Sequence, residues 1–523
     1  MKKQFSFFKI GALSLTALIL AGTSCKKYLY EAPITSTYST AFWTSQTGVE
    51  QASLAMYGQL RASVRSNSSH FINGDLCSGI FVPMQGQWNY QAIKASGYSP
   101  ADKGPFFFSY VPYLADDLQN WSRFYRIIAQ ANLILKNVPE MPASLFKTEA
   151  DRNKYIAEAL FMRAYTYFYM IRIWGDPVYV NKTYDDVDYG NIPPIPRTEE
   201  GKVLDSCISD LKIAAASLSY AGGNTAGSIR ANKGTVSALM AHIYAWKHDY
   251  ANAHIACQDV INNGGYTMEP MATYTNIWKG QQSNENIFEL PMQYNASDPN
   301  FSNQGSWAEA QFGFFATFLK GVPVNNLRSQ CWLSPLTGTG SVTSYYDTSV
   351  DTRFKRVWTK LPASGGDIAG YMLLKYTNFL YQKPDTKSSP YFNNNLVLFR
   401  LSDIVLLDAE ALASTGDLAN ARAALAKTED RAGITTYTAP NTSFDMVKEV
   451  LRERGREFFG EGSWYYDLIR TEQTQKGLET AGYLTTDGRL TEAMKGYYWP
   501  LDMGKLFPYD NLLTQNPYWV NHR

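Results

Sequence analysis

The sequence predicts a mainly α protein in which helical hairpins form a scaffold, with long irregular loop blocks and little β structure. The clearest helical signal lies between residues 396 and 470, where apolar residues recur every three or four positions. Within this stretch, alanines stand at the spacing of helix contacts: Ala409, Ala411, Ala421 and Ala424. Gly416-Asp417 interrupts the pattern, so it predicts two helices joined by a tight turn.

A repeat of this hairpin is the second observation behind the predicted fold. The pattern occurs twice with identical separations, first as Ala241, Tyr244 and Ala253, then as Ala409, Leu412 and Ala421. Alanines let two helices approach closely, while the larger side chain fills the groove between hairpins. The pattern therefore resembles a tetratricopeptide repeat. Because such repeats bury their apolar faces against stacked neighbours, a short solenoid is expected.

Helical periodicity also predicts where the scaffold lies, at about 47–66, 117–265 and 396–470. The expected elements are helices at 47–62, 117–138, 152–174 and 203–218, and a hairpin at 231–263. Gly175-Asp176-Pro177 predicts the end of the third helix. Two intervening blocks, at about 67–115 and 268–395, lack the helical period and are predicted to be rich in loops.

The first residues predict an export signal. Three basic residues precede position 10, an apolar run occupies 10–20, and Ala21-Gly22-Thr23-Ser24 leads to Cys25. The apolar run is too short to span a bilayer, so residues 1–24 are predicted to be a signal peptide that is cleaved. Cys25 directly follows small residues, as the lipidated cysteine of a bacterial lipoprotein does, although Gly22 stands where Leu is usual. An ordinary signal peptide before an unrelated cysteine is the alternative.

Composition argues against several classes of partner and cofactor. The chain of 523 residues has 48 basic and 47 acidic residues, and this balance gives no reason to expect nucleic acid. The other cysteines, Cys77, Cys207, Cys257 and Cys331, have neither CxxC nor metal-ligand spacing. We therefore predict no metal site and no cofactor, with Cys207 and Cys257 as small core residues.

A cluster of charged residues near the end of the helical region has two interpretations. Its members are Glu453, Arg454, Glu457, Glu461, Asp467 and Arg470. Paired carboxylates are the catalytic groups of glycosidases. However, these residues fall one helical turn apart and alternate with basic partners, which favours structural ion pairs. The HExxH and GxSxG motifs of hydrolases do not occur in the sequence.

Several short segments, taken in their order along the chain, resemble one known family. They are 25–33, 158–165 (EALFMRAY), 175–177, 231–234 (ANKG), 400–410, 431–433 (RAG), 453–470, 499–501 (WPL) and 515–517 (QNP). In order and spacing they are similar to the SusD/RagB family of outer-membrane nutrient-binding lipoproteins. The resemblance covers nearly the whole mature chain, so residues 25–523 are expected to form one SusD-like domain.

The resemblance implies a role in binding rather than in catalysis. A SusD-like protein is expected at the cell surface, anchored to the outer membrane by lipid on Cys25. Its partners would be a polysaccharide or oligosaccharide and a SusC-like TonB-dependent transporter, over which it acts as a lid. Two alternatives stay open: a surface glycoside hydrolase, or a helical-repeat scaffold for envelope proteins.

Aromatic residues in the loop blocks predict the ligand contacts. The C–H faces of sugar rings stack on aromatic rings, while sugar hydroxyls need amide or carboxylate partners. The first loop block offers Asp75, Gln87, Trp88 and Asn89, and the second offers Tyr294, Trp307 and Trp332. Of these, Trp88 is the first choice. By contrast, Trp121, Trp174, Trp246 and Trp464 lie in helical patterns and are predicted to be core, while Trp278 fits either class.

Overall fold

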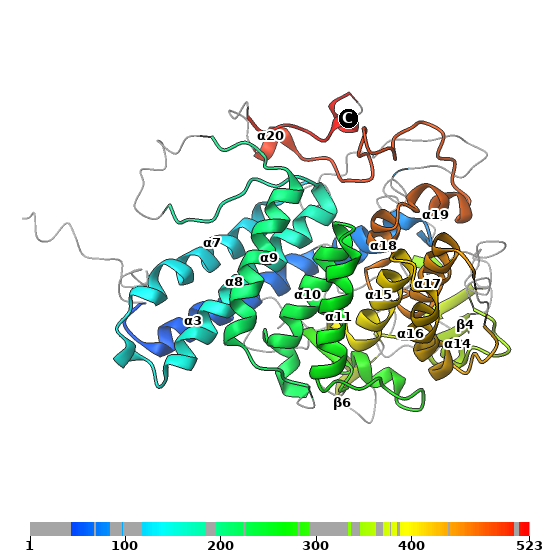
Figure 1. The fold of residues 1–523 in the computed structure, drawn as a ribbon, viewed down its shortest axis with the longest axis horizontal. Helices are drawn as coiled ribbons and strands as arrows, with labels where there is room; N and C mark the ends of the chain where they lie inside the picture. The colour runs from blue at the N-terminus through cyan, green and yellow to red at the C-terminus, as the bar shows by residue number, and fades with distance from the viewer. Residues whose placement is uncertain are drawn as a thin grey trace, which may run out of the picture.

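The computed structural model describes residues 43–66, 69–83, 97, 118–184, 194–222, 225–280, 283–292, 333–335, 346–361, 370–376, 378–383, 388–437, 440–506 and 512–521. Helices dominate these residues, and the predicted mainly α fold is confirmed. In chain order they pack one on the next (Figure 1): α3 (Gln46–Arg65), α7 (Ser122–Asn137), α8 (Glu149–Trp174), α9 (Glu200–Ser217), α10 (Lys233–Trp246), α11 (Tyr250–Asn263), α15 (Leu401–Ser414), α16 (Leu418–Arg431) and α17 (Ser443–Glu457). None of the described helices is both long enough and apolar enough to cross a membrane.

α8 is buried along most of its length because α7 and α9 pack against it. The helix starts where the Thr148 side chain accepts a hydrogen bond from the Asp151 N–H at 3.0 Å, a standard N-cap. At the other end Gly175 takes a φ of 71°. A Cβ on Gly175 would lie 2.8 Å from the ring of Tyr498, so glycine is required there for space as well as for conformation. The predicted end of this helix at Gly175 is confirmed.

The two predicted repeats form matching hairpins, α10–α11 and α15–α16. All four helices have 14 residues, and both second helices begin after an aspartate N-cap, Asp249 in one hairpin and Asp417 in the other. The four contact alanines are fully buried: Ala241, Ala253, Ala409 and Ala421. The predicted register between the hairpins is therefore confirmed. Because α11 packs against α15, the hairpins stack directly although residues 264–400 separate them in sequence.

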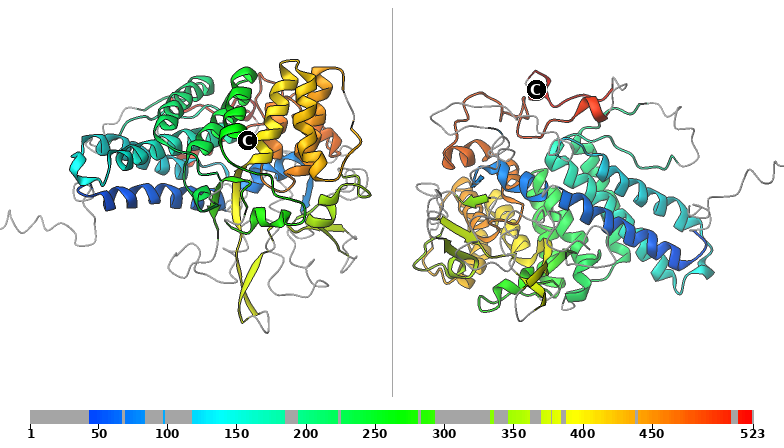
Figure 2. Two further views of the ribbon diagram at one scale, coloured as in Figure 1. Left: turned by 60° about the horizontal axis from the view of Figure 1, so that its bottom comes forward. Right: turned by 180° about the vertical axis from the view of Figure 1, so that it is seen from behind.

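The strands form two-stranded antiparallel ladders beside the helices (Figure 2). The four pairs are β1 (Phe81–Pro83) with β3 (Leu333–Pro335), β2 (Asn286–Pro291) with β8 (Asn395–Arg400), β4 (Trp358–Leu361) with β5 (Gly370–Leu373), and β6 (Phe379–Lys383) with β7 (Ser388–Phe392). β8 corrects one prediction, since residues 396–400 are a strand and not the start of a helix. Their apolar run pairs with β2 through the backbone, and α15 begins only after Arg400.

The core contains most of the residues predicted for it. Trp121, Trp174 and Trp464 are buried, while Trp246 is half-buried with its ring nearly perpendicular to that of Phe168. Trp278, for which the sequence left two interpretations, is fully buried. Cys207 and Cys257 are also buried, as predicted, and burial raises the pKa of both thiols.

Candidate functional site

Most of the predicted ligand contacts fall outside the described residues. They are Gln87, Trp88, Asn89, Tyr294, Trp307 and Trp332, and the predicted lipidation site Cys25 also lies outside. The structure does describe Asp75 and the strands that flank the segments carrying these residues. Those flanking strands, together with the turns that hold them, form the candidate site.

β1 and β3 connect the two predicted ligand segments. Pro83, the last residue of β1, pairs with Leu333, the first residue of β3. Paired strands lie about 5 Å apart, and in an antiparallel pair the end of one strand lies beside the start of the other. The chain that continues to Trp88 therefore leaves the ladder at the end where the chain from Trp332 enters it.

β2 fixes the other end of the second segment. Its last residue, Pro291, pairs with Asn395 of β8, and Tyr294 follows three residues later in the sequence. Phe288 and Leu290 of this strand are buried, and Arg61 of α3 donates a hydrogen bond to the Pro291 carbonyl at 3.3 Å. The second predicted ligand segment thus lies in the sequence between two described strands, β2 and β3.

Asp75 lies just before β1, between α4 (Ser69–Gly74) and η2 (Leu76–Ser78). It is 1% exposed, and its carboxylate accepts a hydrogen bond from the Gly462 N–H at 2.8 Å. Burial raises the pKa of Asp75 to about 7, although the N–H groups of Gly462 and Trp464 act in the opposite direction. Here Asp75 binds the chain itself and holds the segment that leads into β1. Its contact with a ligand stays a prediction.

Two further contacts attach this segment to the turn at 460–463. The Nε2 of His70 donates to the Glu461 carbonyl at 3.0 Å, and its Nδ1 lies 3.2 Å from the Tyr169 hydroxyl. Burial lowers the pKa of His70 to about 4, so the ring is neutral near pH 7. A Cβ on Gly74 would lie 1.8 Å from the Gly462 carbonyl oxygen, so the two backbones touch directly.

The charged cluster around α17 forms buried ion pairs, as the structural interpretation predicts. Glu457 is fully buried and accepts hydrogen bonds from Arg353, Arg400 and Arg431. The Tyr274 hydroxyl adds a fourth at 2.9 Å. Burial alone would raise the pKa of Glu457, but the three arginines outweigh it and hold the pKa well below its usual range.

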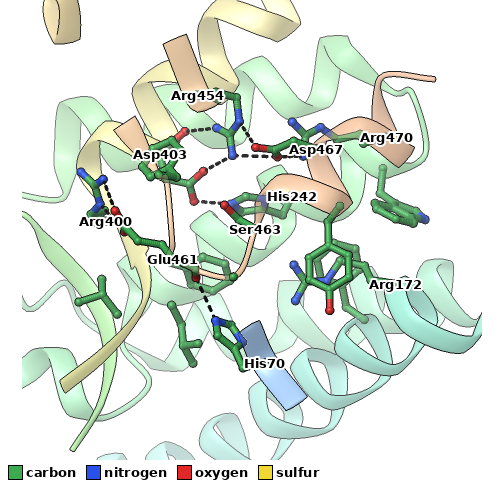
Figure 3. Close-up of a pocket in the computed structure, with 18 of the residues that line it drawn as sticks. His70, Arg172, His242, Arg400, Asp403, Arg454, Glu461, Ser463, Asp467 and Arg470 are labelled. Atoms are coloured by element: carbon green, nitrogen blue, oxygen red, sulfur yellow. Dashed lines mark hydrogen bonds and ion pairs between the residues drawn. The ribbon is translucent and has the colours of Figure 1, made fainter. Parts of the chain in front are cut away.

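Arg454, Asp467 and Arg470 of the cluster also form ion pairs (Figure 3). Arg454 donates to Asp403 at 2.8 Å and to Asp467 at 2.9 Å. Arg470 donates to Asp467 and to Glu410, each at 2.7 Å. The cavity among these side chains measures about 50 Å³, well below the roughly 300 Å³ of a small ligand site. The ion pairs therefore link α15, α17 and α18 (Trp464–Arg470), and the cavity among them has no room for a sugar ring.

The sequence identifies the charged residues of this network between 453 and 470, but not their partners Arg353, Arg400 and Glu285. The partners that tie Arg353, Arg400 and Glu285 into this network lie far away in the sequence. Arg353 and Glu457 are 104 positions apart, and Arg400 and Glu285 are 115 apart. The sequence shows the charges on α17 at helical spacing, but it does not show which distant charges face them. Among the described residues, no group of three or more His, Cys, Asp or Glu side chains is arranged to hold a metal ion.

Comparison with known proteins gives consistent matches along the chain. Residues 271–519 match the model of the SusD family, and residues 91–245 match the model of a family described as starch-binding and associating with the outer membrane. SusD-like protein P38 of Formosa agariphila is 23% identical, with 98% of this chain and 100% of that protein aligned. A SusD-like protein of Bacteroides ovatus is 26% identical, with 88% of this chain and 82% of that protein aligned.

Solved structures share the fold. A SusD homologue from Bacteroides thetaiotaomicron superposes with a TM-score of 0.69 at 23% identity, over 91% of this chain and 98% of that one. A laminarin-binding SusD-like protein superposes with a TM-score of 0.67 at 19% identity, over 91% and 99% of the two chains. With two SusD-type family models matching successive parts of the sequence and relatives aligned from end to end, this chain belongs to the SusD/RagB family.

Proposed function

We propose that this protein is a cell-surface glycan-binding lipoprotein that captures a polysaccharide or oligosaccharide. The pairing of β1 with β3 is the observation that carries this proposal. It joins, at one end of one ladder, the sequence segments that contain Trp88 and Trp332. Aromatic rings supplied from both segments would stack on the C–H faces of sugar rings, and Gln87 and Asn89 would bind sugar hydroxyls.

The captured glycan would then pass to a SusC-like TonB-dependent transporter, over which the protein acts as a lid. Family membership supports this partner, as does the matched family described as associating with the outer membrane. A lipid on Cys25 would hold the protein at the membrane surface. Such an anchor keeps it at high effective concentration near its transporter even when the lid is open.

In this role the protein binds and does not catalyse. The carboxylates that invite a catalytic interpretation, Glu453, Glu457 and Asp467, are buried and paired with arginines. A glycosidase needs one carboxylic acid and one carboxylate on opposite sides of an accessible bond. This arrangement supports a binding protein over the glycoside hydrolase alternative.

Calorimetry of the purified mature chain with a panel of neutral and acidic polysaccharides, laminarin and starch among them, tests the proposal. We expect one glycan class to bind with a Kd between millimolar and micromolar, about −4 to −8 kcal/mol, and to be recovered unchanged. Trp88→Ala should weaken binding by about 2 kcal/mol, the scale of a binding hot spot. Phe444→Ala is the matched control, because it removes a ring that is 60% exposed on the scaffold helix α17.

Each alternative gives a different result. New reducing ends in the glycan would identify a hydrolase. Binding that survives Trp88→Ala but fails in Phe444→Ala would move the site to the helical scaffold. If no glycan in the panel binds while the protein is folded, the capture proposal fails for those glycan classes, and the scaffold alternative gains support.

A further inference from the structure

A second pocket opens beside the C-terminal end of α10, and we name it the Trp246 pocket. Its volume of about 350 Å³ is within the range of small-molecule sites. Four separate parts of the chain build it: the start of α9, the turn after α10, the junction of α18 (Trp464–Arg470) with α19 (Thr474–Thr480), and residues 490–498. Asp75, the one predicted ligand residue that the structure describes, does not line it.

Aromatic side chains form part of its wall. Trp246 is half-buried, and its ring stands nearly perpendicular to that of Phe168, with 6.0 Å between ring centroids. Tyr497 donates its hydroxyl to Glu492 at 2.6 Å, and the neighbouring Tyr498 donates to Glu200 at 2.7 Å. The pocket therefore places fixed aromatic rings beside carboxylates. That combination recognises organic cations, because a ring face and a carboxylate both attract positive charge.

The charge of the lining favours the same kind of ligand. Three of the described residues that line the pocket are glutamates: Glu200, Glu472 and Glu492. The one arginine among its described lining residues, Arg470, already donates to Glu410 and Asp467, both at 2.7 Å. The side chain of Glu472 is 79% exposed, and its carboxylate lies 3.9 Å from the ring of His248. Among the described lining residues, carboxylate charge thus exceeds basic charge.

Unusual backbone conformations also gather here. Among the described residues, the non-glycine positions with positive φ are His248 (58°), Glu472 (57°) and Lys495 (48°). His248 and Glu472 line the pocket, and Lys495 lies 3.6 Å from the carboxylate of Glu200. Such conformations cost about 1 kcal/mol or more each and concentrate at ligand sites and clamps. Three of them from separate segments therefore support a binding role for the pocket.

We propose that the Trp246 pocket binds a small organic cation, a protonated amine, between the Trp246 ring and the carboxylates of Glu472 and Glu492. An amino sugar and a basic amino-acid side chain both carry this group. The proposal goes beyond glycan capture through the loop segments and does not depend on it.

Calorimetry of the purified mature chain at slightly acidic pH tests the proposal with four probes: glucosamine, lysine amide, N-acetylglucosamine and glucose. We expect at least one of the two amines to bind. If glucosamine binds, N-acetylglucosamine, which lacks the charge, should bind at least about tenfold more weakly. The double variant Glu472→Gln/Glu492→Gln should weaken amine binding by about tenfold. Both of these glutamates are exposed, so the fold should be kept. Glu199→Gln, next to Glu200 but outside the lining, is the matched control and should bind as the wild type does.

The probes also separate the two sources of the amine. Glucosamine binding without lysine amide binding identifies an amino sugar, and the reverse identifies a basic side chain; both results support the cation site. Equal binding of glucosamine and glucose would overturn it, as would amine binding that the double variant leaves unchanged. Absence of binding by both amines would overturn it too. Trp88→Ala should not affect amine binding, so failure here is distinguishable from failure of the glycan proposal.

Discussion

At the scale of single residues, burial shifts the pKa values of Asp75 and His70 in opposite directions. Both side chains are buried against the turn at Glu461 and Gly462. Burial favours the neutral form of each, which raises the pKa of Asp75 from 3.8 to about 7 and lowers the pKa of His70 from 6.5 to about 4. Between pH 3.8 and about 7, Asp75 is protonated in the folded state and ionised in the unfolded state. For His70 the unfolded state holds the extra proton.

These shifts predict two opposite pH profiles. The contribution of Asp75 to the free energy of unfolding falls as pH rises from about 4 to 7, whereas that of His70 rises between about pH 4 and 6.5. Asp75→Asn should therefore make stability increase more steeply with pH than in the wild type, and His70→Gln should make it increase less. Each change is at most about 1.4 kcal/mol per pH unit. Urea unfolding across this range measures both, and profiles parallel to that of the wild type would contradict the two shifts.

At the scale of elements, the stacked hairpins make the same turn with different residues. The left-handed position is Gly416 (φ 90°) between α15 and α16, and His248 (φ 58°) between α10 and α11. His248 is held there by a hydrogen bond from its Nε2 to the Arg470 carbonyl at 2.8 Å and by stacking on Tyr250. A Cβ on Gly416 would meet no atom within 4 Å, so the conformation, not the space, favours glycine at this position.

Replacing glycine by alanine should have opposite effects on stability at Gly416, in the turn, and at Gly58, inside α3. Gly416→Ala should destabilise the protein by about 1 kcal/mol, because alanine is strained at positive φ. Gly58→Ala is the matched control, since a Cβ there also meets nothing within 4 Å but the residue lies inside helix α3. It should stabilise by about 0.5–1 kcal/mol, because glycine disfavours a helix interior. Denaturant unfolding gives both values, and effects of the same sign would refute this explanation of the turn.

At the scale of the whole molecule, Glu457 joins elements that are distant in the sequence. Its arginine partners lie in α14 (Thr352–Val357), at the end of β8 and at the end of α16. Next to it, Lys375 donates to the Glu457 carbonyl at 2.7 Å and also to Glu461, whose own backbone holds His70. The network therefore ties the helical scaffold to the segments that lead into the predicted ligand loops.

Glu457→Gln should destabilise the protein by about 3–5 kcal/mol, because it leaves buried arginine charge without its partner. As a matched control, Glu149→Gln removes a carboxylate whose side chain is 55% exposed and paired with Arg152. That substitution should cost about 1 kcal/mol or less. Thermal and denaturant unfolding measure both. Similar small effects would show that the buried network contributes little to stability.

The sequence predicted the fold better than it predicted the site, for physical reasons. Helical period, the alanine contacts and the turn at Gly416 are local patterns, because each involves residues of a single hairpin. The prediction of a helix at residues 396–400 was wrong because a short apolar run fits a strand as well as a helix. Pairing with β2 decides between the two. The segments that contain Trp88 and Trp332 have the composition of loops, but no local pattern shows that β1 and β3, the strands next to them, pair with each other.

By itself, the sequence determined the class of the fold, the repeat register, the structural role of the charges on α17 and the family. Only the tertiary structure decided which distant residues meet. It paired β1 with β3, turned Asp75 inward against Gly462, joined Arg353, Arg400 and Arg431 on Glu457, and built the Trp246 pocket from four segments. The reason is that helices form through contacts between neighbours in the chain. Ion pairs, ladders and pockets depend on long-range packing, which the spacing of residues in a sequence does not record.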